Sequence, residues 1–267
     1  MNPLPTPTLS LDQKIWRYMD LTRLVLLLTR RTLYFSSLTQ LGDPYEGYFP
    51  RSHVEAFAAV FENNFFGPMA ALRPAFEAKS SEHARALDEI MATARQEISF
   101  DRNRGKFGVN CWHANDVESE AMWKLYSALG SGVAVESTVE RLRDVLSPTS
   151  GINIDRVRYE DFDPGQIIKG YSSYFLMLKR PSFAHEREVR ATILLPEEGK
   201  GLEVPCDLQK LIVRVHVAPG APAMFVGAVT ELCSGVVHGQ KFEVLPSKLL
   251  DPPDYDIASF IAPRQNT

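Results

Sequence analysis

Hydrophobic and polar positions follow their clearest pattern between residues 107 and 138. In Phe107–Trp112, every second residue is apolar, which is the period of an extended strand. A polar loop follows, and in Met122–Leu129 apolar residues recur at three- and four-residue spacing, as on one face of a helix. Gly130 can end that helix before the apolar run 133–135. The middle of the chain therefore predicts strand, loop, helix, glycine turn and strand.

Comparable patterns predict the elements on either side. Asp20 is expected to cap a helix that runs through Arg30, and residues 32–36 are rich in β-formers. Thr138 is expected to begin a helix that Pro148 stops. The later elements are predicted, in order, as a strand in 152–159, a helix in 166–179, a strand from Glu186 onward, a strand after 202, a short helix, a strand in 211–217, a helix in 225–237 and a strand in 242–245.

This order of elements indicates an α+β fold in a single domain, with mixed or antiparallel sheets packed with helices. Residues 11–250 are expected to form that domain. Residues 51–100 are expected to be a helical insertion that covers one side of the domain or acts as a lid. The proline-rich residues 1–10 are predicted to be a flexible tail, and residues 251–267 a loosely held C-terminal tail.

Composition narrows the class of protein. The 267 residues are 45% hydrophobic and 23% charged, as in ordinary globular domains, and the net charge of −4 argues against a nonspecific nucleic-acid coat but leaves room for a local basic site. The three cysteines form no CxxC pair, so we expect neither a disulfide framework nor a zinc site. The longest aliphatic run, Leu24–Leu28, is too short to cross a membrane, and the N-terminus does not resemble a signal peptide. We therefore expect a cytoplasmic protein that makes no membrane contact.

Aromatic residues gather beside polar ones in the middle of the chain. Trp112, Trp123 and Tyr126 lie within fifteen residues of one another and next to His113 and Glu118. Rings of this size either pack in a core or form the wall of a pocket that stacks a flat ligand. The apolar helical stripe favours the core, but Trp123 lies one position off that stripe.

Two other segments carry candidate chemistry. Asp43 and Glu46 lie in a loop with turn residues on both sides, so they are either turn-forming groups or ligand contacts held on a rigid loop. In the strand that begins at Glu186, the side chains of Glu186, Glu188 and Arg190 share one face, opposite an apolar face. They form either a surface ladder of ion pairs or a cluster of acids that Arg190 or Lys179 compensates.

Short islands of sequence resemble a widespread bacterial family of uncharacterised domains. The resemblance extends from about Trp16 to about Leu249, and the family brings no settled function with it. The islands are Trp16-Arg17-Tyr18, Leu33-Tyr34-Phe35-Ser36, Asp43-Pro44-Tyr45-Glu46-Gly47, Cys111-Trp112-His113, Glu118-Ser119-Glu120-Ala121-Met122-Trp123, Lys179-Arg180 and His185-Glu186-Arg187-Glu188-Val189-Arg190.

A second resemblance, to ADP-ribosyltransferase folds, rests on the order of four features. These are Arg17 before a helix, the strand 32–36, the aromatic strand and helix of the middle, and the late Glu-x-Glu-Val strand. The resemblance implies an ADP-ribosyltransferase-like core and NAD as a substrate. The usual Ser-Thr-Ser triplet is absent, and Asn110-Cys111-Trp112 stands in the centre instead.

The same resemblance implies roles for individual residues. Glu188 would be the catalytic glutamate, with Glu186 beside it. The residues that would bind the cofactor are Arg17, Tyr18, Ser36, Trp112, Trp123 and Tyr126. The acceptor of the ADP-ribosyl group would be a protein side chain, a nucleic-acid base, or water.

Two other functions compete with this interpretation. A non-catalytic sensor or effector module would capture a small molecule or a protein in the same pocket. A metal-dependent nuclease would use the acids Asp43, Glu46, Glu186 and Glu188 with Lys179, and it ranks third because no lysine follows Glu188 at the expected spacing. The ADP-ribosyl-transfer interpretation requires that the segments near residues 17, 123 and 188 line one cleft, with an acidic floor and an aromatic wall.

Overall fold

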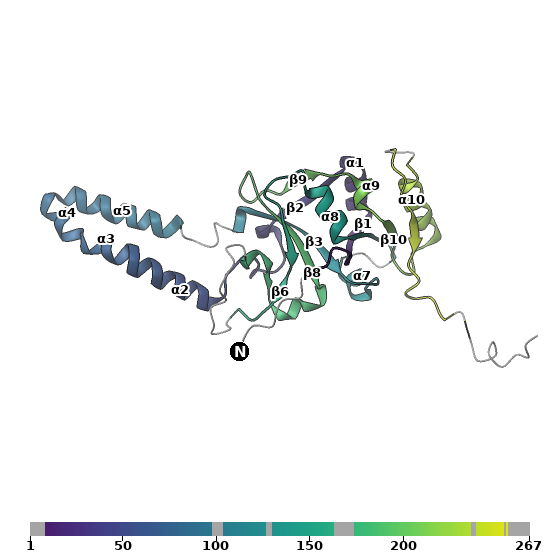
Figure 1. The fold of residues 1–267 in the computed structure, drawn as a ribbon, viewed down its shortest axis with the longest axis horizontal. Coiled ribbons are helices and arrows are strands. Elements are labelled where there is room, and N and C mark those ends of the chain that lie inside the picture. Colours follow the sequence, from purple (N-terminus) through teal and green to yellow (C-terminus); the bar gives the residue numbers. More distant parts are fainter. Residues whose placement is uncertain are drawn as a thin grey trace, which may run out of the picture.

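The computed structural model describes residues 9–97, 104–126, 130–162, 174–235, 239–253 and 255. A mixed sheet forms its centre, and the described strands join in the order β11-β10-β4-β1-β3-β2-β9, while β8 pairs with β3 and with β5 (Figure 1). The ladders are antiparallel except for the parallel pair β10 and β11. The strands of this sheet are β1 Lys14–Asp20, β2 Thr32–Ser37, β3 Phe107–Ala114, β4 Gly132–Thr138, β5 Asn153–Arg156, β8 Glu188–Leu194, β9 Leu202–Pro205, β10 Arg214–Val217 and β11 Val244–Pro246.

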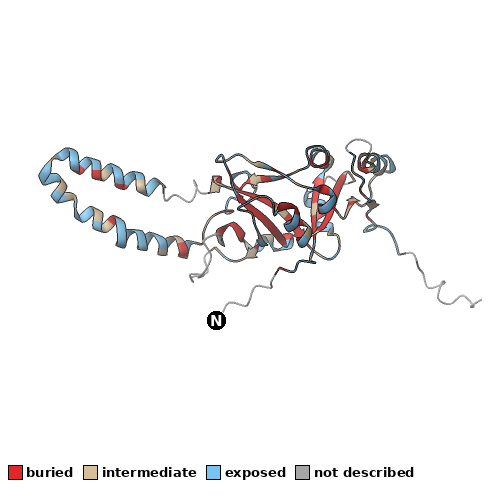
Figure 2. Cartoon of the chain, turned by 45° about the horizontal axis from the view of Figure 1, so that its top comes forward, coloured by how far each residue is buried: buried red, intermediate tan, exposed pale blue. Residues whose placement is uncertain are grey.

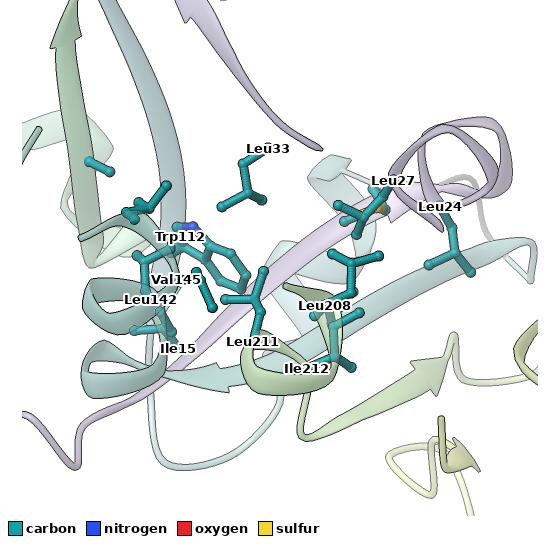
Figure 3. Packing of buried hydrophobic residues seen from close by; sticks show 14 of the residues in the cluster. Ile15, Leu24, Leu27, Leu33, Trp112, Leu142, Val145, Leu208, Leu211 and Ile212 are labelled. Carbon is teal, nitrogen blue, oxygen red and sulfur yellow. The ribbon is translucent and has the colours of Figure 1, made fainter. Parts of the chain in front are cut away.

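Helices pack on both faces of this sheet. On one face, the main core includes Leu24 and Leu28 of α1, Leu142 of α8 and Leu208 of α9, and Figure 3 shows part of this core around Trp112. On the other face, α7 contributes to a smaller aromatic cluster. The bounds of these helices are α1 Leu21–Arg30, α7 Glu120–Tyr126, α8 Val139–Leu146, α9 Leu208–Leu211 and α10 Ala223–Cys233. The structure thus confirms the predicted α+β class.

A helical arm, which lies between β2 and β3 in the sequence, projects from the sheet (Figure 1). Its helices bury only a few side chains between them, including Phe66, Leu87 and Met91, and most of the arm is exposed (Figure 2). The arm consists of α2 Arg51–Phe61, a π-helical turn Glu62–Phe66, α3 Gly67–Ala71, α4 Arg73–Lys79 and α5 Ser81–Glu97. Helices therefore occur where the sequence predicted them. The predicted covering or lid role stays a prediction, and residues 98–100 lie outside the described residues.

The described sheet contains a split that positions the candidate site. β1 pairs with the end of β3, through Trp16 and His113, whereas β2 pairs with its beginning, through Ser36 and Val109. The middle of β3, residues 110–112, has no partner from either strand on that edge in these two ladders. The side chain of Asn110 fills part of this gap, because its Nδ2 donates to the carbonyl of Tyr34 at 2.9 Å. The split leaves space between β1 and β2 that side chains line.

Most elements agree with the sequence predictions. Asp20 is the N-cap of α1 and accepts a hydrogen bond from the backbone N–H of Arg23 at 2.8 Å. The strand, helix and strand of the middle stretch are β3, α7 and β4, and α7 is described to Tyr126. The C-terminal order of strand, short helix, strand, helix and strand is also present.

Three predicted elements differ from the structure. The strand expected from Glu186 begins at Glu188, because Arg187 adopts a left-handed φ of 42° that ends the 3₁₀ turn Pro181–Glu186. The segment 152–159 forms two short strands, β5 and β6 (Arg158–Tyr159), which belong to different sheets. The helix expected in 166–179 was wrong over its described end, which is a 3₁₀ turn, Tyr174–Met177, followed by β7 Leu178–Lys179.

The remaining predictions at the termini fall mostly outside the described residues. This is so for residues 1–8 of the predicted N-terminal tail and for most of 251–267. Within the described part of the chain, each helix is too short or too polar to cross a lipid bilayer.

Candidate functional site

The split in the sheet opens into a cavity of about 470 Å³. β1, the loop after β2, β3, α7 and the segment from β7 to β8 all contribute to its wall. The residues that line it are Trp16, Arg17, Tyr18, Arg23, Ser36, Gln40, Leu41, Gly42, Asp43, Glu46, Val109, Cys111, Trp112, His113, Met122, Tyr126, Lys179, Phe183, Glu186, Glu188 and Arg190. Almost every segment of the sequence that carried candidate chemistry therefore contributes a side chain to the cavity.

Arg17 lies on β1 with its side chain on the same face as Ile15 and Met19, which belong to the main core. Its guanidinium is 5.8 Å from the centroid of the Trp112 ring. Its Nη1 is buried and has no hydrogen-bond partner among the described residues. Burial lowers the pKa of Arg17 to about 10, so the side chain is still a cation at neutral pH. Arg17 is thus a desolvated positive charge that lacks a counter-ion from the described part of the chain.

The acids of the cavity do have counter-ions. Lys179 Nζ is 3.0 Å from Glu46 Oε1, 2.5 Å from Glu186 Oε2 and 3.5 Å from Glu188 Oε2. Arg190, which is fully buried, donates from Nε to Glu188 Oε1 at 2.6 Å and from Nη2 to Glu188 Oε2 at 3.0 Å. Its Nη2 also pairs with Glu46. Both oxygens of Glu188 are therefore bound by one guanidinium.

This network sets the protonation states. Burial by itself would raise the pKa of Glu188, but the Arg190 charge, the hydrogen bonds from Arg190 and the Lys179 charge lower it to about 2. Burial would lower the pKa of Lys179, but the attraction of Glu188 and Glu46 raises it well above its ordinary value. Glu188 is therefore an anion, and Lys179 a cation, at every pH near neutrality.

Glu186 has a different environment from Glu188. Its Oε1 accepts a hydrogen bond from the hydroxyl of Tyr126 at 2.9 Å, and its Oε2 accepts one from Lys179. Burial and the neighbouring Glu186 charge raise the pKa of Tyr126, so that the hydroxyl keeps its proton and can donate. One oxygen of Glu186 thus faces a neutral donor, whereas both oxygens of Glu188 face a cation.

His113 provides a second buried atom without a partner. Its Nδ1 is 2.6 Å from the carbonyl oxygen of Glu186, and because a carbonyl can only accept, Nδ1 carries the proton. Burial lowers the pKa of His113, so the ring is neutral at pH 7 and its Nε2 is an acceptor. That Nε2 is buried without a hydrogen-bond partner among the described residues. The cavity wall therefore contains one unmatched cation and one unmatched acceptor.

A second cavity of about 360 Å³ adjoins the first. The two share the four residues Arg17, Tyr18, Arg23 and Ser36. The second cavity extends from there between α1 and β2 towards Glu203 of β9. Arg17 therefore stands at the junction of two compartments.

The structure brings together seven of the eight residues predicted for the site. Arg17, Tyr18, Ser36, Trp112, Tyr126, Glu186 and Glu188 all line the first cavity. Their roles in binding or catalysis stay predictions.

Trp123 is the exception, since it does not line either cavity. Only 2% of its surface is exposed, its ring meets the Tyr18 ring edge-on at 4.9 Å, and its Nε1 donates to Glu118 Oε2 at 2.9 Å. Position 123 of α7 faces β1, whereas Tyr126, three residues later, reaches the acids. The predicted cleft near residues 17, 123 and 188 therefore forms around Tyr126 and Trp112.

The predicted acidic floor needs a second correction. Lys179 and Arg190 lie among Glu46, Glu186 and Glu188, so the floor is a compensated network of both signs. Sequence reasoning assigned no role to His113 or Phe183, which also line the cavity. His113 belongs to the island Cys111-Trp112-His113, and Phe183 lies between the island Lys179-Arg180 and the island at residues 185–190, but nothing in the sequence showed that these segments meet.

The same network bears on the nuclease interpretation. Each of its acids already binds a cation: Asp43 pairs with Arg180 at 2.8 Å, and the three glutamates pair with Lys179 or Arg190. In the described part of the chain, no group of three or more His, Cys, Asp or Glu side chains has an arrangement that could hold a metal ion. The positively charged groups occupy the positions that a divalent ion between these acids would need.

Comparisons with known proteins leave the family open. No family model matches the chain, and no curated protein matches it, so the resemblance to a bacterial family stays a prediction. A solved structure of Thermus sp. 2.9 DarT in complex with ADP-ribosylated ssDNA aligns with 90% of this chain and 97% of that chain, at 10% sequence identity and a TM-score of 0.40. A likeness of this extent assigns neither family nor function, and the site itself carries the proposal that follows.

Proposed function

We propose that this chain binds NAD⁺ across the two adjoining cavities and cleaves its nicotinamide–ribose bond, with transfer of the ADP-ribosyl group to an acceptor or to water. The observation that carries the proposal is the buried Nη1 of Arg17, which has no hydrogen-bond partner among the described residues and lies at the junction of the two cavities. A buried cation without a counter-ion is costly unless a ligand supplies the anion. NAD⁺ is a ligand of this form, because its diphosphate lies between two nucleoside halves.

The volumes of the cavities support a dinucleotide. Compartments of about 470 and 360 Å³ each fall in the range that a drug-sized group fills. With the diphosphate at Arg17, and with Arg23 close to the same junction, one nucleoside would occupy each compartment. The nicotinamide half belongs in the larger one, because the carboxylates and Tyr126 line it.

The unmatched acceptor of the larger cavity also has a place in this arrangement. The Nε2 of His113 can accept a hydrogen bond from a ribose hydroxyl. The faces of Tyr18 and Trp112 lie nearby and can contact the sugar or the nicotinamide ring. Both kinds of contact would hold the ribose next to Glu186.

The chemistry requires a carboxylate near the ribose. As the C–N bond to nicotinamide breaks, nicotinamide leaves as a neutral molecule with the electron pair, and positive charge develops on the ribose. An acceptor oxygen or nitrogen then bonds to the same carbon and releases its proton. Glu186 is placed to stabilise that charge, because only one of its oxygens is bound by a cation. Glu188, which Arg190 holds through both oxygens, would fix the network behind it.

Two measurements test the proposal. Calorimetric titration with NAD⁺ should show binding, and Arg17→Met should weaken it about tenfold or more, since a charge-assisted contact to the diphosphate is lost. Arg85→Met, an exposed arginine of α5, is the matched control and should bind as the wild type does. Release of nicotinamide, followed by chromatography, should fall at least a hundredfold in Glu186→Gln. Equal NAD⁺ affinity in the Arg17 and Arg85 variants would refute the proposal.

One observation favours a non-catalytic binding module as the second candidate. Every carboxylate in the cavity already has a cation, and such a compensated network suits a stable binding wall as well as a catalyst. In that case NAD⁺ or a related dinucleotide would bind through Arg17 without nicotinamide release. Wild-type binding without turnover would favour this second function over the first.

A further inference from the structure

A third cavity lies on the other side of the loop that follows β2. It has a volume of about 330 Å³ and is open to the surface. Four of its six lining residues are aromatic, and we call it the aromatic recess. The residues that line it are Pro44, Tyr45, Tyr48, Phe49, Arg51 and Phe162.

The loop 43–47 separates the recess from the larger cavity. Asp43 and Glu46 line the larger cavity, whereas Pro44 and Tyr45 line the recess. Because consecutive Cα atoms are only about 3.8 Å apart, the wall between the two sites is a single turn of chain. A molecule held in the recess is therefore next to the proposed reaction site.

The loop is rigid enough to hold both walls. Asp43 accepts a hydrogen bond from the backbone N–H of Tyr45 at 3.0 Å, and the backbone N–H of Glu46 donates to the Asp43 carbonyl at 3.1 Å. Gly47 has a φ of +79°, a conformation that favours glycine. Asp43 also binds Arg180 at 2.8 Å, which ties the loop to the segment after β7.

Two rings of the recess, Tyr45 and Tyr48, each have an arginine beside them. The Tyr45 side chain is 45% exposed, its ring meets Phe162 edge-on at 5.4 Å, and the Arg180 guanidinium lies 4.4 Å from its centroid. Arg104 lies 4.7 Å from the centroid of the Tyr48 ring. Flat rings offer stacking surfaces, and the arginines beside them can contact phosphate.

We propose that the aromatic recess binds a nucleobase of single-stranded nucleic acid. Unpaired bases stack on aromatic rings and on arginine planes, while their phosphates pair with nearby cations. A duplex keeps its bases stacked inside, so it does not fit a recess of this kind. The role of the recess as the acceptor site rests on the proposed function: a base held there places the next nucleotide of the strand at the rim of the larger cavity.

The charges near the recess suggest the path of the strand. The acids Asp43 and Glu55 are paired with Arg180 and with Arg51, respectively. The cations beside the rings are Arg180, next to Tyr45, and Arg104, next to Tyr48. The backbone is therefore expected to run past Arg180 and Arg104.

Fluorescence anisotropy with a short, labelled oligonucleotide of mixed sequence tests the proposal in the absence of NAD⁺. Single-stranded DNA or RNA should bind at low salt and weaken as salt is added, and the same sequence as a duplex should bind at least tenfold more weakly. Tyr45→Leu should weaken single-strand binding about tenfold or more, whereas Tyr45→Phe, which keeps the ring, should stay within about twofold of the wild type. Phe65→Ala, an arm residue that is 40% exposed, is the control and should have no effect.

Each outcome decides the matter. If Tyr45→Leu loses single-strand binding, Phe65→Ala does not, and Tyr45→Leu still unfolds cooperatively, the recess is supported as the binding site. Absence of oligonucleotide binding, equal binding of single strands and duplex, equal loss in Tyr45→Leu and Phe65→Ala, or binding of a tyrosine-containing peptide in place of the oligonucleotide would overturn it. NAD⁺ binding without oligonucleotide binding would refute this inference and leave the proposed function intact. Oligonucleotide binding without NAD⁺ binding would refute the proposed function and leave the recess as a nucleic-acid site.

Discussion

Replacement of Arg190 by methionine is the most informative perturbation of the buried network. Arg190 is fully buried and bonds to Glu188, Glu46 and the carbonyl of Leu176. Methionine replaces the aliphatic stem of arginine but carries no guanidinium, so both glutamates would remain buried with only Lys179 to compensate them. Loss of one partner from a buried ion pair costs about 3–5 kcal/mol. We expect Arg190→Met to lower the free energy of unfolding at pH 7 by that amount.

The lowered pKa of Glu188 corresponds to a free energy of similar size. It falls from an ordinary value of 4.5 to about 2, and each unit is worth about 1.4 kcal/mol, so the folded state gains about 3 kcal/mol from the ionised carboxylate. Because the folded pKa is lowered, this stability is present above about pH 4.5 and is lost as the pH falls towards 2. In Arg190→Met, the pKa of Glu188 should rise, and this part of the acid dependence should shrink or reverse.

Urea unfolding at a series of pH values measures both effects. The exposed pair Lys200–Glu197 provides the control, because Lys200→Met should change the stability by less than about 1 kcal/mol at any pH. Glu188→Gln combined with Arg190→Met should cost less than the sum of the two single changes, since the charges are removed together. A loss below about 1 kcal/mol in Arg190→Met, or an acid dependence identical to that of the wild type, would refute the reasoning.

Two further predictions concern residues at and behind the cavity. Arg17→Met should leave the free energy of unfolding unchanged or raise it by about 1 kcal/mol, because it removes a desolvated charge without a counter-ion. Urea unfolding without NAD⁺ measures this change. A loss of several kcal/mol would show that Arg17 has a structural partner. Trp123→Phe should lower the stability by about 1–2 kcal/mol, through the lost bond to Glu118 and the smaller ring, yet leave NAD⁺ affinity unchanged in calorimetry. A large drop in the NAD⁺ affinity of Trp123→Phe would show that Trp123 does contribute to the binding site.

The features that the sequence predicted well are those that depend on local pattern. The alternation from Glu188 to Leu195 correctly separated a polar face from an apolar one, because successive side chains of a strand point to opposite sides. The cap at Asp20 was equally local. Such features need only the order of residues within one element.

The features that escaped prediction depend on contacts between distant segments. Glu46 and Arg190 are 144 residues apart in the chain and meet only because β3 carries β8 along one edge and the loop after β2 passes its beginning. Trp123 was misplaced because a one-position offset from an apolar stripe does not reveal that β1 offers a second apolar surface on that side. The periodicity of apolar residues predicts which face of a helix is buried, but it does not predict what packs against the other faces.

The positions of the charges in the cavity support an anionic ligand at Arg17. An acidic floor would call for a cationic ligand, but Lys179 and Arg190 lie among Glu46, Glu186 and Glu188 and offset two of their three negative charges within the protein. The charge left over at the junction of the two cavities is the guanidinium of Arg17, which the split between β1 and β2 leaves without a protein partner for its Nη1 among the described residues. Under the proposed function, Glu186 would act on a group that Arg17 has already anchored by its negative charge. If the proposal holds, the binding step depends on Arg17 and the chemical step on Glu186, so Arg17→Met should lower affinity and Glu186→Gln should lower turnover.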